Sequence, residues 1–426
     1  MLIYPTLNLY LYDIRACLGQ NDEDIKQNRA NFKRKLRLVS LENQTILDNL
    51  DQETEKEYLE LFDQNRVDSL PSDSNFPKHD GYYYPVRFND SYGLLLNCSL
   101  AENQKTNDLT WLKSLQKLVA DRVSNQKGTL GETWFFSAQL ENLEQSEELA
   151  TKIYQTLMPD AKATKNHFLN GKIFEFWKND DDKHHVIIRF YKEKTSLDQE
   201  TQFYPDWMRL LFYRHKMTWA YNQSRQLVKR LKQDAINIKT TEQQLRDSTK
   251  DKKLDSQQLQ TTLNDAWNIL SEYSTSLDEL NDQIHTIEIN SDNYEIRLNK
   301  LLEKSASSLK VFKNFHDQAT KKYCKQVKKD YEAFSPKLRR LENLINYIRA
   351  SVAIREEARD HKLLNTATFL GIGLATGAIV SSIIEQAPLI TEGNSWQNFL
   401  FSLSISIGAA ILAGLFMKGI ISRKQK

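Results

Sequence analysis

Glycine and proline are missing from the middle of this 426-residue sequence. No glycine occurs between Gly171 and Gly371, and no proline occurs between Pro205 and Pro336. These two residues are the ones that most reliably interrupt a helix, so a long stretch free of both favours long helices. We therefore predict that the central part of the chain is α-helical.

Cysteine and the common catalytic motifs are equally scarce. The three cysteines, Cys17, Cys98 and Cys324, form no Cys-x-x-Cys pair, which argues against a disulfide framework and against a zinc site. The sequence has no dinucleotide-binding, Walker or nucleophile-elbow motif, and Gly128 and Gly131 are an isolated pair. We predict no catalytic residue, no cofactor-binding residue, no cofactor and no metal site.

The charges are almost balanced. The chain has 58 basic and 56 acidic residues. Leaving out Lys418, Arg423, Lys424 and Lys426, and the acids Glu385 and Glu392, leaves 54 of each sign in 1–362. A nucleic-acid partner is therefore disfavoured for the chain as a whole.

Two uncharged, apolar runs close the sequence, at 363–384 and 399–421, where Lys418 is the only charged residue. At about 1.5 Å per residue each is long enough for the roughly 30 Å core of a bilayer, so we predict two transmembrane helices joined by an external loop, 385–398. Basic residues flank the pair and are absent from the loop, which predicts an inner (plasma) membrane protein with both chain ends, including the tail 422–426, in the cytoplasm. The residues predicted to anchor this topology are Arg355, Arg359, Lys362, Trp396, Lys418, Arg423 and Lys424.

Small residues recur within both predicted spans and would let two helices approach closely. They pack either the two spans of one chain or the spans of neighbouring chains. The predicted packing positions are Gly373, Gly377, Gly408, Ala410 and Gly414.

A heptad pattern runs through the glycine-free region and is apolar at thirteen of sixteen core positions between Leu263 and Phe315. Such a pattern predicts a coiled coil and, with the spans, a homo-oligomer. The predicted core residues are Leu263, Leu270, Leu277, Leu280, Ile284, Ile287, Leu298, Leu301, Phe312 and Phe315.

The polar segment around 247–256 predicts a reversal between two antiparallel helices within 206–335, the first of about 40 residues and the second of about 75. Ser335 followed by Pro336 resembles a helix start, so we predict a separate juxtamembrane helix over 336–362.

Strand signals concentrate in 1–205, which we predict to be a cytoplasmic α+β domain. Leu7, Leu9 and Leu11 alternate with polar or tyrosine residues, as in a strand. We predict helices at 22–39, 45–62 and 144–157, and hairpins around 89–91 and 179–182. The order β-α-β-β-α-β that opens the domain is that of a ferredoxin-like split fold, so we predict an antiparallel sheet with helices on one face. The predicted fold class is thus an α+β domain, a long helical coiled coil and a C-terminal transmembrane hairpin.

Two small groups of residues carry possible chemistry. Asp180, Asp181, Asp182, His184 and His185 are of metal-ligating types, but aspartates in a hairpin turn usually cap the backbone. A second group surrounds the junction of the two predicted domains. There Arg214 and Lys216 could hold an anion, or the aromatic residues beside them could form a packing junction.

These features lead to one functional expectation and two alternatives. We expect a membrane-anchored signalling or effector protein whose N-terminal domain senses a ligand or a protein partner, and whose helices oligomerise to act on the lipid bilayer, as in prokaryotic defence. The first alternative is a non-enzymatic tether or scaffold, and the second is a membrane-associated enzyme with its active site in 1–205.

Overall fold

The computed structural model of the chain divides into two compact units. The first contains Met1–Arg230 and Ser276–Ala333, and the second contains Leu231–Thr275 and Phe334–Lys426. The residues that the structure describes are 1–17, 20–36, 50, 56–61, 79–100, 105–106, 109–158, 173–178, 181–193, 203–250, 256–305 and 310–357.

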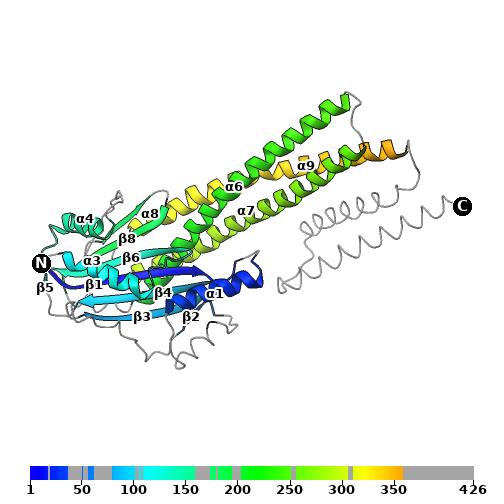
Figure 1. The fold of residues 1–426 in the computed structure, drawn as a ribbon. Helices are drawn as coiled ribbons and strands as arrows, with labels where there is room; N and C mark the ends of the chain where they lie inside the picture. Colours follow the sequence, from blue (N-terminus) through cyan, green and yellow to red (C-terminus); the bar gives the residue numbers. More distant parts are fainter. Residues whose placement is uncertain are drawn as a thin grey trace, which may run out of the picture. The chain divides into compact units, whose positions relative to one another are not determined.

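The first unit is built on an eight-stranded mixed sheet in the order β2-β3-β4-β1-β6-β8-β7, with β5 paired to β1. The central strands lie side by side in Figure 1. All neighbours are antiparallel except β6 and β8, which are parallel. The strands are β1 (Leu2–Ile14), β2 (Tyr58–Glu60), β3 (His79–Phe88), β4 (Ser91–Leu100), β5 (Lys105–Thr106), β6 (Gly131–Leu140), β7 (Ile173–Lys178) and β8 (Asp181–Tyr191).

The sheet corrects the predicted antiparallel class. After β6 the chain forms α4 (Ser146–Leu157) and then the β7–β8 hairpin, whose second strand lies beside β6. Because the chain has crossed over before it returns, β8 runs parallel to β6. The predicted helix 45–62 is also wrong at its end, where β2 forms instead, while 45–49, 51–55 and 62 lie outside the described residues.

Helices cover both faces of the sheet, although the sequence predicted only one. Leu7, Leu9 and Leu11 of β1 join the core beneath α1 (Asp22–Leu36), α3 (Thr110–Arg122) and α4. On the other face, the hydroxyl of Tyr12 donates a hydrogen bond of 2.9 Å to the backbone oxygen of Met208, in the long helix α6 (Tyr204–Lys250). Because both faces are covered, β1 is buried along nearly its whole length.

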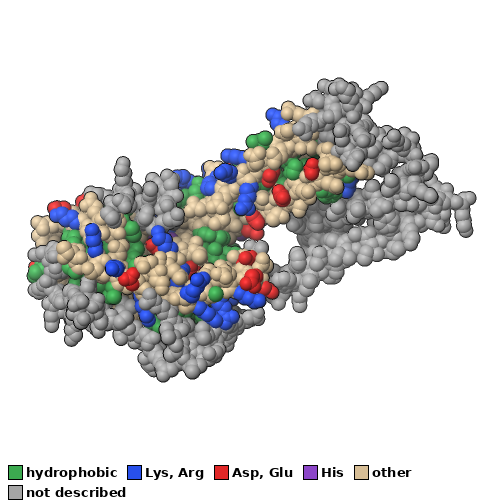
Figure 2. All heavy atoms as spheres, in the orientation of Figure 1, with side chains coloured by type: hydrophobic (Ala, Val, Ile, Leu, Met, Phe, Trp, Pro, Cys, Tyr) green, Lys and Arg blue, Asp and Glu red, His purple; other side chains and the backbone are tan. Residues whose placement is uncertain are grey.

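The surface charges of the first unit are mixed in sign. Asp22, Glu23 and Asp24 open α1, and Lys33, Arg34 and Lys35 close it, which complements the helix dipole. On the described face drawn in Figure 2, acidic and basic side chains are interspersed and form no continuous surface of one sign.

Three long helices contribute to both units. They are α6, α7 (Ser256–Ser305) and α9 (Lys325–Glu357), and the short helices α8 (Lys310–Gln318) and η2 (Ala319–Cys324), a π-helix, precede α9. In the first unit, Arg297 of α7 donates a 2.8 Å hydrogen bond to Asp206 near the start of α6, and Tyr294 donates one of 3.2 Å to the backbone oxygen of Phe312. Consequently α7 runs antiparallel both to α6 and to the segment that follows α7.

The described helices change two details of the prediction. The second helix does not continue for about 75 residues, because α7 ends at Ser305 and α8 begins at Lys310. No separate helix begins at Pro336, which lies inside α9. In the second unit, Tyr273 donates a 2.8 Å hydrogen bond to the backbone oxygen of Phe334, two residues before this proline. Tertiary contacts of this kind help to hold α9 helical through a residue that removes one backbone donor.

The predicted coiled-coil residues are largely enclosed. Leu263 and Leu270 are half-buried, and the other eight, from Leu277 to Phe315, are buried. The contacts that enclose them include contacts within this chain, since the rings of Tyr294 and Phe315 have centroids 5.5 Å apart. An assembly of several chains through the same residues stays a prediction.

The structure does not support the predicted membrane anchor. Among the described residues, which end at Glu357, no helix combines the length and the apolar character needed to cross a bilayer. The reason lies in the composition of α6, α7 and α9, which carry charged side chains throughout their length. The predicted spans 363–384 and 399–421 lie outside the described residues, as do their packing positions. We therefore withdraw the prediction of a transmembrane, inner-membrane protein.

Candidate functional site

Two polar sites flank α6 in the first unit, and three consecutive residues of that helix contribute to one site or the other. Arg214 and His215 face a buried cluster on the sheet, whereas Lys216 faces a pocket. Successive side chains on a helix point about 100° apart, so Arg214 and Lys216 diverge by about 200°. The predicted anion clamp is therefore not formed, because the two cations do not converge.

The buried cluster connects three strands to α6 by hydrogen bonds. Nε2 of His185 on β8 lies 2.9 Å from Oε1 of Glu175 on β7, and Nδ1 of the same ring lies 2.7 Å from the hydroxyl of Thr133 on β6. That hydroxyl is also 2.7 Å from Nε2 of His215. All four residues are fully buried. Its hydrogen bonds link α6 to strands β6, β7 and β8 of the sheet.

The charge of this cluster is balanced by an arginine. The guanidinium of Arg214 lies 3.3 Å from Oε1 of Glu175, and both side chains are buried. Burial raises the pKa of Glu175, and the nearby Arg214 opposes that rise. His185, which the sequence grouped with candidate metal ligands, is thus held by Glu175 and Thr133. Within the described residues no group of three or more His, Cys, Asp or Glu side chains could hold a metal ion.

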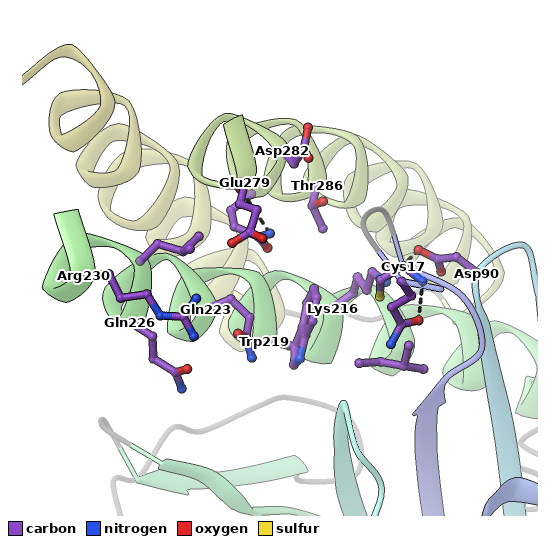
Figure 3. Close-up of a pocket in the computed structure, with 14 residues that line it drawn as sticks. Cys17, Asp90, Lys216, Trp219, Gln223, Gln226, Arg230, Glu279, Asp282 and Thr286 are labelled. Carbon is purple, nitrogen blue, oxygen red and sulfur yellow. Dashed lines mark hydrogen bonds and ion pairs between the residues drawn. The ribbon is translucent and has the colours of Figure 1, made fainter. Parts of the chain in front are cut away.

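The pocket is a cavity of about 280 Å³ whose walls come from three parts of the first unit. Figure 3 shows α6 along one side, α7 along the opposite side and the ends of strands closing it. Its polar and aromatic lining includes Asp90 from the β3–β4 turn, Lys216 and Trp219 from α6, and Glu279, Asp282 and Gln283 from α7. A cavity of this size lies near the lower end of the range for small-molecule sites.

One end of the pocket is closed by an ion pair. The ammonium group of Lys216 donates a hydrogen bond of 2.7 Å to Oδ2 of Asp90 and lies 5.1 Å from the ring centroid of Trp219. Nearby, burial raises the pKa of the Cys17 thiol, an effect that Lys216 opposes and Asp90 reinforces. Because Asp90 neutralises Lys216, this end of the pocket carries little net charge.

The α7 wall is rich in hydrogen-bond acceptors. Nε2 of Gln283 donates a hydrogen bond of 3.3 Å to the backbone oxygen of Glu279, whereas its Oε1 atom is buried and has no hydrogen-bond partner among the described residues. Asp282 lies beside it, and burial raises the pKa of its carboxyl, while His285 opposes that rise. The carboxylates of Glu279 and Asp282 line this wall, and neither has an ion-pair partner among the described residues.

Sequence analysis did not identify this pocket. Apart from Leu227, its α6 residues follow one another at intervals of three or four and form a largely polar stripe on one helix face: Lys216, Trp219, Gln223, Gln226 and Arg230. That spacing was the available signal. Of the predicted topology anchors, Arg355 lies in α9, and the others lie outside the described residues.

Comparison with known proteins adds no assignment. No protein-family model, no curated protein and no solved structure matches the chain. The case for a function therefore depends on the geometry of the pocket and of the helices beside it.

Proposed function

We propose that the chain is a ligand-responsive regulatory protein, in which the pocket binds a small polar molecule and α6 and α7 respond to it. The observation that carries this proposal is the origin of the pocket walls. One wall is formed by the strand ends at Ile14 and Asp90, and the others by α6 and α7. A molecule in the pocket would contact all three parts at once.

Such a site gives a ligand a means to act on the helices. A bound molecule shifts a conformational equilibrium only when it binds one arrangement more tightly than the other. A ligand that contacts both α6 and α7 meets this condition. Any displacement of one helix relative to the other would remove part of its binding surface. The ligand would therefore stabilise one placement of α6 against α7.

The test compares the full chain with a variant in which the pocket is filled. Thr286 lines the pocket on α7, and Thr275 is an exposed threonine of the same helix that does not. Thr286→Trp should fill the cavity, and Thr275→Trp controls for the new indole. The melting temperature of each protein would be measured with and without the small-molecule fraction of an extract of its native cells.

We expect the fraction to raise the melting temperature of the wild type and of Thr275→Trp, because a ligand that binds only the folded state stabilises it by mass action. Thr286→Trp should show no rise. Hydrogen exchange of the wild type should slow in α6 and α7 under the same condition. If the wild type and Thr286→Trp respond alike, the pocket is not the site and the proposal fails.

A further inference from the structure

The hydrogen-bonding groups of the pocket are unequally used. Its buried cation, Lys216, already donates to Asp90, and the amide nitrogen of Gln283 already donates to a backbone oxygen. In contrast, Oε1 of Gln283 is enclosed and has no hydrogen-bond partner within the part of the chain that the structure describes. Lys216 and Gln283 therefore each use at least one donor within the protein itself.

Two carboxylates extend this acceptor-rich wall. Glu279 and Asp282 are three residues apart on α7, which places them on one face of the helix, and both line the cavity beside Gln283. Within the described residues neither carboxylate forms an ion pair. Arg230, the remaining cation of the lining, is exposed to solvent on α6. A negatively charged ligand would therefore meet two carboxylates and a lysine that is already neutralised.

The opposite wall carries a large aromatic side chain. Trp219 of α6 lines the cavity, and the ammonium group of Lys216 lies near one face of its ring. An indole favours a cation over its face through its quadrupole and packs well against methylene groups. Figure 3 shows Trp219 on the α6 side and Glu279 and Asp282 on the α7 side.

We propose that the pocket binds a small organic cation, an alkylammonium compound whose charged nitrogen lies at the carboxylates of Glu279 and Asp282 and whose carbon atoms pack against Trp219. This inference rests on the proposed function and specifies the ligand of the same site. An ammonium group supplies both things that the α7 wall lacks, a positive charge and hydrogen-bond donors.

The pH dependence of binding follows from Asp282. Burial raises the pKa of its carboxyl, and an ammonium group at the site binds the ionised form. Affinity should therefore fall as the pH is lowered through that raised pKa. The charged or titratable groups that surround Asp282 are Asp278, Glu279 and His285 on α7, Lys216 and Arg230 on α6, and Cys17 and Asp90 at the strand ends.

The experiment is calorimetric titration of the full chain with putrescine and agmatine. The uncharged control ligand is 1,4-butanediol, which replaces the two amines of putrescine by hydroxyls. Glu279→Gln and Asp282→Asn remove one negative charge each with little change of shape. Asp292→Asn is the matched control, because Asp292 is an exposed acid of α7 outside the pocket. Circular dichroism would verify that each variant is folded.

We expect at least one of the two amines to bind the wild type and Asp292→Asn with equal affinity, and butanediol not to bind. Each pocket variant should weaken that binding about tenfold or more, which is the loss expected for one charge-assisted hydrogen bond. If no amine binds, or if Asp282→Asn and Glu279→Gln bind as tightly as the wild type, the inference is wrong. If the amines fail while the cell-extract fraction still stabilises the wild type and not Thr286→Trp, only the ligand class is wrong and the proposed function stands.

Discussion

Arg214 and Lys216 lie two residues apart on α6, and each is buried against a different carboxylate. Arg214 pairs with Glu175 on β7, and Lys216 pairs with Asp90 in the turn between β3 and β4. Both side chains are at most 4% exposed. A strand and a turn of the sheet are thus attached to neighbouring positions of one helix, and the orientation of α6 on the sheet is fixed from two sides.

The two partners of the pair at the pocket should not be equivalent. The side chain of Lys216 is 4% exposed, whereas that of Asp90 is 44% exposed. Asp90→Asn leaves a buried ammonium group without its carboxylate and should lower the free energy of unfolding by about 3 kcal/mol. Lys216→Met leaves a carboxylate that water can reach, and its cost should be about 1 kcal/mol or less. Urea unfolding at pH 7 measures both.

The double variant Asp90→Asn with Lys216→Met tests the same asymmetry. The second substitution removes the ammonium group that Asp90→Asn leaves unpaired, so the double variant should be more stable than Asp90→Asn alone. If the two single variants are equally destabilised, the pair behaves as an exposed one and this account of its burial is wrong.

Thr133 should be important for stability although it is a small side chain. Its hydroxyl lies 2.7 Å from a nitrogen of His185 and 2.7 Å from a nitrogen of His215. Thr133→Val keeps the shape but removes both hydrogen bonds inside a fully buried cluster. We expect a loss of about 2–4 kcal/mol in urea unfolding. Thr156→Val serves as the control. The hydroxyl of Thr156 donates a hydrogen bond to the backbone of its own helix, so its removal should change stability by less than about 0.5 kcal/mol.

The pH dependence of stability should reveal the buried carboxyl of Glu175. Burial raises the pKa of this group above the usual 4.5, although Arg214 opposes the rise. As the pH increases from 4.5, the unfolded chain releases this proton first, so the native state binds more protons and loses stability relative to the unfolded state. Glu175→Gln cannot ionise. The wild-type free energy of unfolding minus that of Glu175→Gln should therefore decrease with rising pH until the native carboxyl has ionised.

That comparison needs unfolding curves at several values of pH from 4 to 8, with about one unit between them. A difference that stays constant or increases over this range would contradict a raised native pKa for Glu175. Tyr154→Phe, which alters a buried group of the other sheet face, is a suitable control because it should leave the pH profile unchanged.

The sequence predicted local structure better than it predicted which segments meet. The alternation of Leu7, Leu9 and Leu11 indicated a strand, and β1 covers those residues. The same alternation places Tyr10 and Tyr12 on the opposite face of that strand, but it does not identify what covers the face. In the structure both tyrosines are buried, because α6 covers that face. Periodicity identifies the buried side of an element but not the segment that buries it.

The heptad pattern shows the same limit. It continues in one register from Leu263 through Ser305 to Phe315, which predicted one long helix. In the structure α7 ends at Ser305, and Phe315 packs back against Tyr294 of the same chain. A heptad pattern indicates which residues face a partner helix. Here part of that partner is α8, the helix that follows α7. The sequence does not indicate the pocket for a related reason. Its polar residues on α6 and α7 come together only when the two helices pair.

Gly128 and Gly131 were an uninformative pair in the sequence, and the structure gives them a packing role that leads to a last prediction. A Cβ atom on Gly128 would lie 2.3 Å from the backbone oxygen of Gly131 and 2.6 Å from that of Tyr12. The oxygen of Tyr12 also accepts a 3.0 Å hydrogen bond from the backbone of Leu130, so it cannot retreat without breaking that bond.

Gly128→Ala should therefore cost about 3 kcal/mol or more, because backbone atoms must move. At Gly93 a Cβ atom would lie 2.8 Å from a methyl group of Val86, a side-chain atom that can turn away, so Gly93→Ala should cost about 1–2 kcal/mol. Urea unfolding ranks the two variants, and if Gly128→Ala does not accumulate as soluble protein while Gly93→Ala does, the same order holds. The opposite order would mean that the loop before β6 moves away from β1 more easily than Val86 changes its rotamer.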